Sequence, residues 1–547
     1  MELSLPLYSS QESRRTDTNP LRGPRKLKLA HATRMEHALW LLCAATSGVS
    51  SLLYYYLANI TRRRSGTTGR RRRLPPGPRP LPLLGNLLDL RGGNGNLHHT
   101  LARLALTHGP VMRIELGLGL VTAVVISSPA ATAEAFTRHD GALAARAVPD
   151  MARAAGFADR SMIWLPSSDP RWKALRGVAA SNAFSPRRLA AARGAREHKV
   201  RDLVHYFRHR AKHGREEAVD VGTAVYGGVL NLVSCALFSA DVVDVGAASA
   251  QGLRELVEEI VGAIAKPNVS DLFPLLRPLD LQGWRLWTAR RFHKVFRVLD
   301  DIVDARLAAD DDAHGDFLDA LLELVSAGKM ARNDVTAIMF DVFAAGSDTI
   351  AVTVEWAMAE LLRHTSAMAR VRAEIEGALG SKESVEETDA AGLRYLQAVV
   401  KEAMRLHPVA PLLLLPHRAS EDGVEVGGYA VPRGCTVIFN AWAIMRDPAA
   451  WERPDEFVLE RFLGGEGETT GSRGKDFRFI PFGSGRRLCP GLPMAERVVP
   501  LVLASLLHAF DWRLPDGVSA EQLDVSEKFT TANVLAVPLR AVPVART

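Results

Sequence analysis

A cysteine set among glycines at the start of an apolar segment is the residue of this chain best suited to chemistry. Cys489 lies in PFGSGRRLCPG (481–491), and the apolar run MAERVVPLVLASLLHAF follows it. Glycine lets the backbone approach a bound group closely. Amide N–H groups at a helix N-terminus, with Arg486 and Arg487 nearby, favour the thiolate. Such a thiolate is a nucleophile or a metal ligand, unless the cysteine is buried and inert. A nucleophile needs a positioned base, and this loop has no histidine.

Polar residues also interrupt a long apolar segment that is expected to form a buried helix over residues 333–364. At its centre lie Ala345, Gly346, Ser347, Asp348 and Thr349. Small and polar residues inside a helix weaken its hydrogen-bond ladder and invite a local kink or a water molecule. Two interpretations stay open on the residues alone. Either the hydroxyl groups bond back to carbonyls of their own helix, or the segment is a polar notch beside a buried reaction centre.

Two further pairs of residues have the spacing of neighbours on a helix. Glu402 and Arg405 in KEAMRLHP are three apart and share one face, and exposed pairs of this kind contribute only about 0.2–0.5 kcal/mol. Trp172 and Arg176 are four apart and place two kinds of N–H donor side by side, which suits a carboxylate. A solvated surface pair is the more ordinary interpretation of either pattern.

Together these segments resemble the signatures of the cytochrome P-450 superfamily, the haem-thiolate monooxygenases. FGSGRRLCPG is similar to the FxxGxRxCxG signature, which implies that Cys489 is the axial ligand of the haem iron, heme b, and that Phe482 contacts the cofactor. AGSDT resembles the oxygen-activating motif of the family. The resemblance implies that Thr349 orients a proton-delivering water, that Asp348 relays protons and that Gly346 makes room for dioxygen.

The same resemblance gives roles to the other pairs. KEAMRLHP resembles the ExxR motif, and FVLERF supplies Arg461, so that Glu402, Arg405 and Arg461 are expected to form a buried structural network that holds the cysteine loop. Leu459 stands where the usual pattern has proline. The expected clamp on the haem propionates comprises Trp172, Arg176, His417 and Arg487, with Arg146 as a further donor.

Length and composition indicate a folded globular protein and exclude several other classes of protein. At 547 residues the chain is long enough for about three or four domains. Its four cysteines include no CxxC pair, which excludes a disulfide framework and a thiolate zinc site. Seven arginines and no acid lie between residues 62 and 73. The basic charge is therefore local and does not indicate a nucleic-acid-binding face.

The body of the chain is expected to be mainly helical with a small β portion. Residues 111–127 are β-branched and partly alternating, which predicts a hairpin. Helical spacing dominates afterwards, and β signals return at 423–437. No solenoid repeat and no second low-complexity linker divide residues 83–547. The resemblance implies one mainly α catalytic domain with a small β lobe over that range, against the several domains that length alone suggests.

The N-terminal part of the sequence predicts a single membrane anchor. Residues 38–60 contain no charge, and at about 1.5 Å per residue they span a hydrocarbon core of about 30 Å. We therefore expect an anchor over 35–61 and an Arg- and Pro-rich linker over 62–82. A signal peptide and an interfacial or buried helix are the alternatives. Flanking arginines favour a cytosolic body at the endoplasmic reticulum membrane. Residues 1–34 form a polar tail, and our hypothesis is that translation begins at Met35.

The activity implied by the resemblance is hydroxylation of an unactivated C–H bond with O2. Electrons from NADPH are expected through a membrane-bound cytochrome P-450 reductase, docked at Arg473, Lys475, Arg478 and Arg486. The last apolar segment resembles plant geraniol 8-hydroxylase-like terpenoid hydroxylases, with a phenylpropanoid or flavonoid hydroxylase as the alternative. A non-oxygenating isomerase or dehydratase and a haem electron carrier are remoter alternatives. The expected substrate segments are Val148–Trp164, Phe343–Ala345, Val409–Leu414 and Phe529–Thr531.

Overall fold

The chain divides into two units, residues 1–71 and 72–547. The computed structural model describes residues 73–91, 95–117, 119–213, 217–242, 248–266, 268–308, 314–413, 415–464, 471, 473–530 and 532–546. The predicted tail, the predicted anchor and linker residues 62–72 lie outside the described residues. All that follows concerns the second unit.

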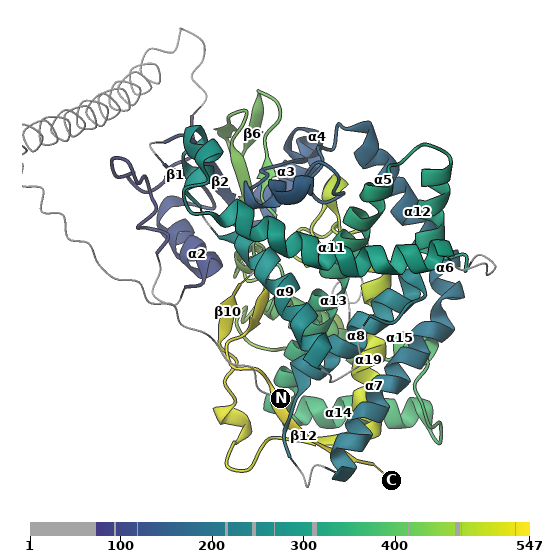
Figure 1. The fold of residues 1–547 in the computed structure, drawn as a ribbon. Coiled ribbons are helices and arrows are strands. Elements are labelled where there is room, and N and C mark those ends of the chain that lie inside the picture. The colour runs from purple at the N-terminus through teal and green to yellow at the C-terminus, as the bar shows by residue number, and fades with distance from the viewer. Residues whose placement is uncertain are drawn as a thin grey trace, which may run out of the picture. The chain divides into compact units, whose positions relative to one another are not determined.

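Most of the described body is helical, as the spacing predicts (Figure 1). The first helices are α2 (Leu97–His108), α3 (Pro129–Arg138), α4 (Asp140–Leu143), α5 (Pro170–Asn182), α6 (Pro186–Ala191), α7 (Arg193–His213), α8 (Val221–Phe238), α9 (Ala248–Ala265) and α10 (Val269–Leu272). The later helices are α11 (Trp284–Ala308), α12 (Phe317–Ser326), α13 (Arg332–Arg363), α14 (Thr365–Leu379), α15 (Glu387–Gly392), α16 (Arg394–Leu406), α17 (Ala441–Ile444) and α19 (Leu492–Ala509). Short 3-10 turns are η1 (Met151–Gly156), η2 (Pro274–Leu279), η3 (Leu459–Phe462), η4 (Gly485–Arg487) and η5 (Ala520–Gln522).

The strands form small sheets beside this helical body. The largest sheet has the order β1-β2-β8-β5-β3, from β1 (Val111–Leu116), β2 (Val121–Ile126), β8 (Thr436–Phe439), β5 (His417–Arg418) and β3 (Ala145–Arg146). A second sheet joins β4 (Val219–Asp220), β12 (Arg540–Ala545) and β9 (Phe510–Arg513). Two hairpins pair β6 (Val424–Val426) with β7 (Tyr429–Val431) and β10 (Glu527–Phe529) with β11 (Asn533–Leu535).

Both β predictions are confirmed. The expected hairpin at 111–127 is the antiparallel pair β1–β2, in which Val111 lies opposite Ile126 and Leu116 opposite Val121. The later β signal gives the hairpin β6–β7 and the strand β8, and β8 pairs in parallel with β2. Distant parts of the chain thus share one sheet, and β5 carries His417 into the same layer.

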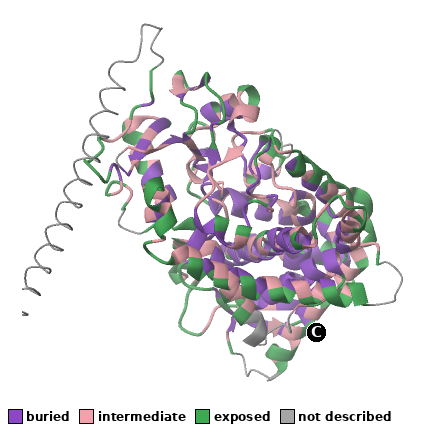
Figure 2. Cartoon of the chain, turned by 45° about the horizontal axis from the view of Figure 1, so that its top comes forward, coloured by how far each residue is buried: buried purple, intermediate pink, exposed green. Residues whose placement is uncertain are grey.

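Three apolar helices form the centre of the body. α8, α13 and α19 are long and apolar enough to cross a membrane by length and composition, yet 83%, 72% and 72% of their most apolar windows are buried inside the protein. α13 packs against both α8 and α19. A helix that is hydrophobic on nearly all sides is one that the core surrounds, and Figure 2 shows the buried positions gathered in the interior. The core therefore accounts for their composition.

Local sequence explains where two site-bearing helices begin. Asp169 caps α5 by accepting the backbone N–H of Arg171, and Pro170 occupies the first turn, where its missing N–H costs nothing. α19 begins directly after Gly491, with Pro493 in its first turn. These starts place Trp172 and Arg176 on the first and second turns of α5 and leave Cys489 just before α19.

Candidate active site

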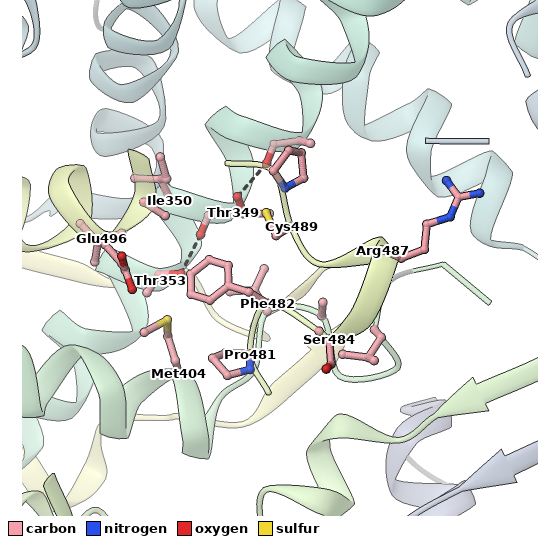
Figure 3. Close-up of a pocket in the computed structure, with 18 of the residues that line it drawn as sticks. Thr349, Ile350, Thr353, Met404, Pro481, Phe482, Ser484, Arg487, Cys489 and Glu496 are labelled. Atoms are coloured by element: carbon pink, nitrogen blue, oxygen red, sulfur yellow. Dashed lines mark hydrogen bonds between the residues drawn. The ribbon is translucent and has the colours of Figure 1, made fainter. Parts of the chain in front are cut away.

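A cavity of about 560 Å³ lies between α13 and the loop that precedes α19. Figure 3 shows Thr349 and Thr353 from the helix, and Phe482 and Cys489 from the loop, around this space. The predicted clamp residues line the same cavity: Arg146, Trp172, Arg176, His417 and Arg487. The fold thus brings residues from five separate segments to the predicted metal ligand.

A close backbone approach shapes the cysteine loop. Gly485 has a φ of 65°, and a Cβ there would lie 2.1 Å from a carboxylate oxygen of Asp140. That carboxylate accepts the backbone N–H of Arg486 at 3.1 Å. Only glycine meets both requirements, because other residues rarely adopt positive φ and their Cβ would collide with Asp140. The backbone N–H of Cys489 then donates to Phe482 O at 3.1 Å and closes the turn.

The environment of the Cys489 thiol differs from the sequence-based expectation. Burial raises the pKa of Cys489, and this effect outweighs the backbone N–H groups of Gly491 and Leu492 and the nearby charge of Arg176. We had expected the helix N-terminus and the arginines to favour the thiolate. Burial outweighs them, so they do not by themselves deprotonate Cys489. A bound metal cation would supply the missing charge, because coordination deprotonates a thiol outright.

The basic residues around the cavity lack acidic partners. Among the described residues, Arg146, Arg176 and Arg487 form no ion pair with a carboxylate. Arg146 donates to Leu415 O at 2.6 Å, but its Nε is buried without a partner. Burial lowers the pKa of Arg146 to about 9 and that of Arg487 to about 10, with mutual repulsion adding to the effect. The cavity therefore holds positive charge that an anionic ligand would neutralise.

The other two clamp residues support this cluster in different ways. The indole N–H of Trp172 donates to Met162 O at 3.1 Å, so it is not offered to the cavity. The Trp172 ring instead stacks with Arg487, whose guanidinium lies 4.6 Å from the ring centroid. His417 is buried and its Nδ1 lies 2.9 Å from Leu143 O. Burial and the neighbouring arginines lower the pKa of His417 to about 3.

The polar segment of α13 does not break the helix. Ser347 Oγ donates to Phe343 O at 2.9 Å and Thr349 Oγ1 donates to Ala345 O at 2.7 Å, which is the back-bonding interpretation. The notch interpretation also holds on one face, because Ala345 and Thr349 line the cavity. Gly346 faces α8 instead, since a Cβ there would lie 3.4 Å from Val233. Its expected role toward dioxygen stays a prediction.

Asp348 likewise points away from the cavity of Cys489. It lines a second cavity, shared with residues of α9 and of the β10–β11 hairpin. Burial raises the pKa of Asp348 to about 6, and Arg254 opposes the rise. Its Oδ1 is buried without a hydrogen-bond partner. The two residues of the predicted acid–threonine pair therefore face different cavities across one helix.

The structure brings the predicted buried network together. Glu402 and Arg405 are fully buried and joined by two hydrogen bonds of 2.7 and 2.9 Å. Arg461 Nε lies 3.2 Å from Glu402 Oε1, and the backbone N–H of Val458 donates to the same oxygen. Arg405 also donates to the carbonyls of Met445, Pro454 and Glu456. The motif thus ties α16 to the segment that includes η3, and Leu459 is accommodated as a buried residue of that turn.

The residues present fit the haem that the resemblance implies. A thiol and a hydroxyl-bearing helix face line the cavity, and the arginines that lack acidic partners match two propionate carboxylates. Cys489 would hold the iron, and Arg146, Arg176 and Arg487 would hold the propionates. Charge-assisted hydrogen bonds of this kind are about twice as strong as neutral ones.

The expected substrate segments are divided between the two cavities. Met162, Ile163, Ala345, Val409 and Leu413 line the cavity of Cys489. Phe529 and Thr530 line the second cavity instead. Leu414 and Thr531 lie outside the described residues. The wall around Cys489 is thus mostly aliphatic, which suits an apolar ligand.

Sequence reasoning missed Asp341, a buried acid one heptad before Asp348. Asp341 accepts the hydroxyl of Ser161 at 2.7 Å and the backbone N–H groups of Met162 and Ile163, while burial raises its pKa to about 7. It therefore holds the segment whose carbonyls receive Arg487. The seven-residue spacing of Asp341, Asp348 and Glu355 was the available signal.

The expected docking residues lie at or near the surface. Arg473, Lys475 and Arg486 are exposed, and Arg478 is partly buried. Arg478 pairs with Asp476 at 2.9 Å and Arg486 with Asp140 at 3.5 Å. The exposed residues can meet a protein partner without rearranging the core.

Comparison with known proteins agrees with this site. The family model "Cytochrome P450" matches residues 75–537. The chain is 66% identical over 511 residues to Cytochrome P450 76M5 of Oryza sativa subsp. japonica, covering 92% of this chain and 98% of that protein. It is 62% identical over 477 residues to Oryzalexin D synthase and 61% identical over 474 residues to Ent-cassadiene C11-alpha-hydroxylase 1, both from the same plant, with 86% of this chain and 93% of each relative covered. The chain belongs to the cytochrome P450 family of haem-thiolate monooxygenases.

Proposed function

We propose that this enzyme hydroxylates an unactivated C–H bond of a terpenoid, with Cys489 as the axial ligand of the haem iron. One observation carries the proposal: Cys489 lies in a cavity that basic residues line in part and whose remaining wall is mostly apolar. Relatives above 60% identity are named for ent-cassadiene hydroxylation and for oryzalexin D synthesis. A terpene hydrocarbon such as ent-cassadiene is therefore the substrate to test first.

Each side chain of the site has a separate part in this function. When bound, haem binds dioxygen and activates it for insertion into the substrate. Cys489 holds the iron, and Arg176 and Arg487 hold the propionates. The hydroxyl of Thr349 donates to Ala345 O, which leaves its oxygen lone pairs to accept a hydrogen bond from a water in the cavity. Asp348 passes protons toward that water from the neighbouring face of the helix.

Substrate contacts come from the aliphatic wall. Met162 and Ile163 are fixed by Asp341, and Leu413 and Val409 approach from the segment after α16. Burying one methylene of substrate contributes about 0.8 kcal/mol, so a hydrocarbon skeleton gains affinity from this wall without any polar contact. A phenylpropanoid would bring hydroxyl groups, for which these aliphatic side chains offer no partners.

The electron-donating partner and the cellular location of the enzyme are part of the same proposal. NADPH electrons reach the enzyme through cytochrome P-450 reductase, which docks near the exposed Arg473 and Lys475. An anchor within residues 35–61 holds the enzyme at the endoplasmic reticulum membrane with the catalytic unit in the cytosol. Pairing between these exposed basic residues and acidic residues of the reductase steers association and makes it sensitive to salt.

The test is turnover of ent-cassadiene by the purified enzyme with reductase, NADPH and 18O2. The proposal expects a product one oxygen heavier that carries the 18O label, formed only when NADPH is present. Product without label or without NADPH would identify a non-oxygenating rearrangement instead. Turnover of cinnamate but not of ent-cassadiene would replace the terpenoid assignment by a phenylpropanoid one.

A further inference from the structure

A second cavity of about 1120 Å³ lies on the other face of α13. Asp348 and Glu355 from α13 line it, together with Arg254 and Glu258 from α9. The side chain of Glu258 is 49% exposed and that of Glu259, which also lines the cavity, is 48% exposed. The cavity therefore runs from solvent beside α9 to the half-buried Asp348 and the buried Glu355 on the central helix.

The rotation of α13 directs neighbouring residues of this helix toward different cavities. Seven residues turn an α-helix by about 700°, about 20° short of two full turns, so Asp348 and Glu355 share one face and lie about 10 Å apart along the axis. Thr349 is turned by about 100° from Asp348 and faces the cavity of Cys489 (Figure 3). Asp348 thus lines the second cavity, while the next residue along the helix lines the cavity of Cys489.

Asp348 has an unmet requirement that water would satisfy. Its Oδ1 is buried without a hydrogen-bond partner, although buried polar atoms are nearly always paired. Arg254 lies close enough to lower its pKa, yet donates its hydrogen bonds to Glu258 at 2.8 Å and to Thr223 at 3.3 Å. A water in the adjoining cavity is the partner that the geometry leaves room for.

Glu355 offers a second exchangeable proton in the same cavity. Its Oε1 accepts the backbone N–H of Leu539 at 3.0 Å. Gly222 makes space for this carboxyl group, because a Cβ there would lie 2.6 Å from its oxygens. Burial raises the pKa of Glu355 to about 7, with Asp220 and Asp348 adding to the rise and Arg254 opposing it. A carboxyl group with this pKa is both donor and acceptor of protons at neutral pH.

We propose that the second cavity is the proton intake of the enzyme, in which Glu355 passes protons through water to Asp348. This inference rests on the relay role given to Asp348 in the proposed function. Each hydroxylation converts RH, O2, NADPH and H+ into ROH, H2O and NADP+, so two protons end in the water formed. Glu355 donates one proton to the water chain and regains one from solvent, and its own charge is unchanged over a cycle.

The experiment compares Glu355→Gln with the wild-type holoenzyme and a matched control. Glutamine keeps a carbonyl acceptor for Leu539 but carries no exchangeable acid proton. Glu134→Gln is the control, because Glu134 also accepts one backbone N–H, that of Gly427 at 2.8 Å, and lines neither cavity. The readouts are product formed per NADPH, hydrogen peroxide released, the solvent isotope effect in D2O, and turnover driven by added hydrogen peroxide.

The proposal expects Glu355→Gln to form at least about tenfold less product per NADPH, since positioned proton donors contribute about 10²–10⁴-fold. Its solvent isotope effect should exceed that of the wild type. Peroxide-driven turnover should match the wild type, because peroxide brings its own protons and electrons. The Glu134→Gln control should resemble the wild type in every readout. Wild-type product yield and isotope effect in Glu355→Gln would overturn the proposal.

A second variant decides the matter if Glu355→Gln folds poorly. Gly262 lines the same cavity, and a Cβ there would meet nothing within 4 Å. Gly262→Leu therefore obstructs the cavity while removing no acid, and should reproduce the lower product yield with normal peroxide-driven turnover. A raised substrate KM with unchanged product yield would show a passage for substrate and overturn the proton role. A failure of the proposed function would look different. The wild type itself would then turn over no substrate, either with NADPH or with added hydrogen peroxide.

Discussion

Glu402→Gln should destabilise the protein by about 3–5 kcal/mol, because it leaves buried arginines without their counter-charge. Glu402 and Arg405 are both fully buried, and the side chain of Arg461 is only 8% exposed. Glutamine has the same shape but no charge, and its amide group cannot accept at both positions that Arg405 and Arg461 require. Since domains are stable by only about 5–15 kcal/mol, the loss is a large fraction of the total.

The assay is urea denaturation followed by circular dichroism, with haem content measured on the same samples. Glu460→Gln is the control, because Glu460 stands next to Arg461 but pairs with Arg370 at the surface, where both side chains are about 60% exposed (63% and 58%). Such a pair contributes about 0–1 kcal/mol. A Glu402→Gln variant as stable as this control, with full haem content, would refute the claim that the network holds the cysteine loop.

Three further outcomes are expected. Thr349→Ala should keep its haem but release more hydrogen peroxide per NADPH, and an unchanged product yield in an oxidase assay would count against the hydroxyl group as an organiser of water. Arg176→Gln should retain haem about 10- to 100-fold less tightly, since one charge-assisted hydrogen bond contributes about 1.5–3 kcal/mol. Transfer of haem to apomyoglobin measures this, with the exposed Lys173→Gln on the same helix as control. Glu360, held by His364 at 3.2 Å and by His407 at 2.7 Å, has its pKa lowered from 4.5 to about 2 by these two partners, although burial opposes them. Its contribution of about 3 kcal/mol is present above pH 4.5 and lost as pH falls toward 2. Glu360→Gln should therefore flatten the loss of stability in acid, and a curve of wild-type slope would contradict this.

Motifs in which spacing alone defines the chemistry could be predicted from the sequence. Glu402 and Arg405 must share a helix face at a separation of three, and Cys489 must precede the apolar helix directly. The hairpin at 111–127 and the helical body follow equally from local periodicity. In each case the deciding contacts are close along the chain, or the motif specifies its distant partner, as FVLERF does for Arg461.

Predictions failed or stayed open where distant segments decide the outcome. The pKa of Cys489 depends on burial by the whole fold, which outweighs the helix N-terminus. Trp172 donates to Met162, a partner outside its own helix that no spacing reveals. Phe529 lines a different cavity from Val409 because the β10–β11 hairpin is placed by long-range packing. The different cavities faced by Asp348 and Thr349 are the exception, since adjacent residues of a helix differ by a rotation of about 100°.

The carbon-monoxide difference spectrum of the reduced protein tests the central claim most directly. The account predicts a strongly red-shifted Soret band for the wild type, because Cys489 is bound to the haem iron and the opposite position is open. Cys489→Ala should lose this band. A wild-type band at the position of histidine-ligated haem, in a sample shown to be folded and to contain haem, would contradict the assignment of Cys489.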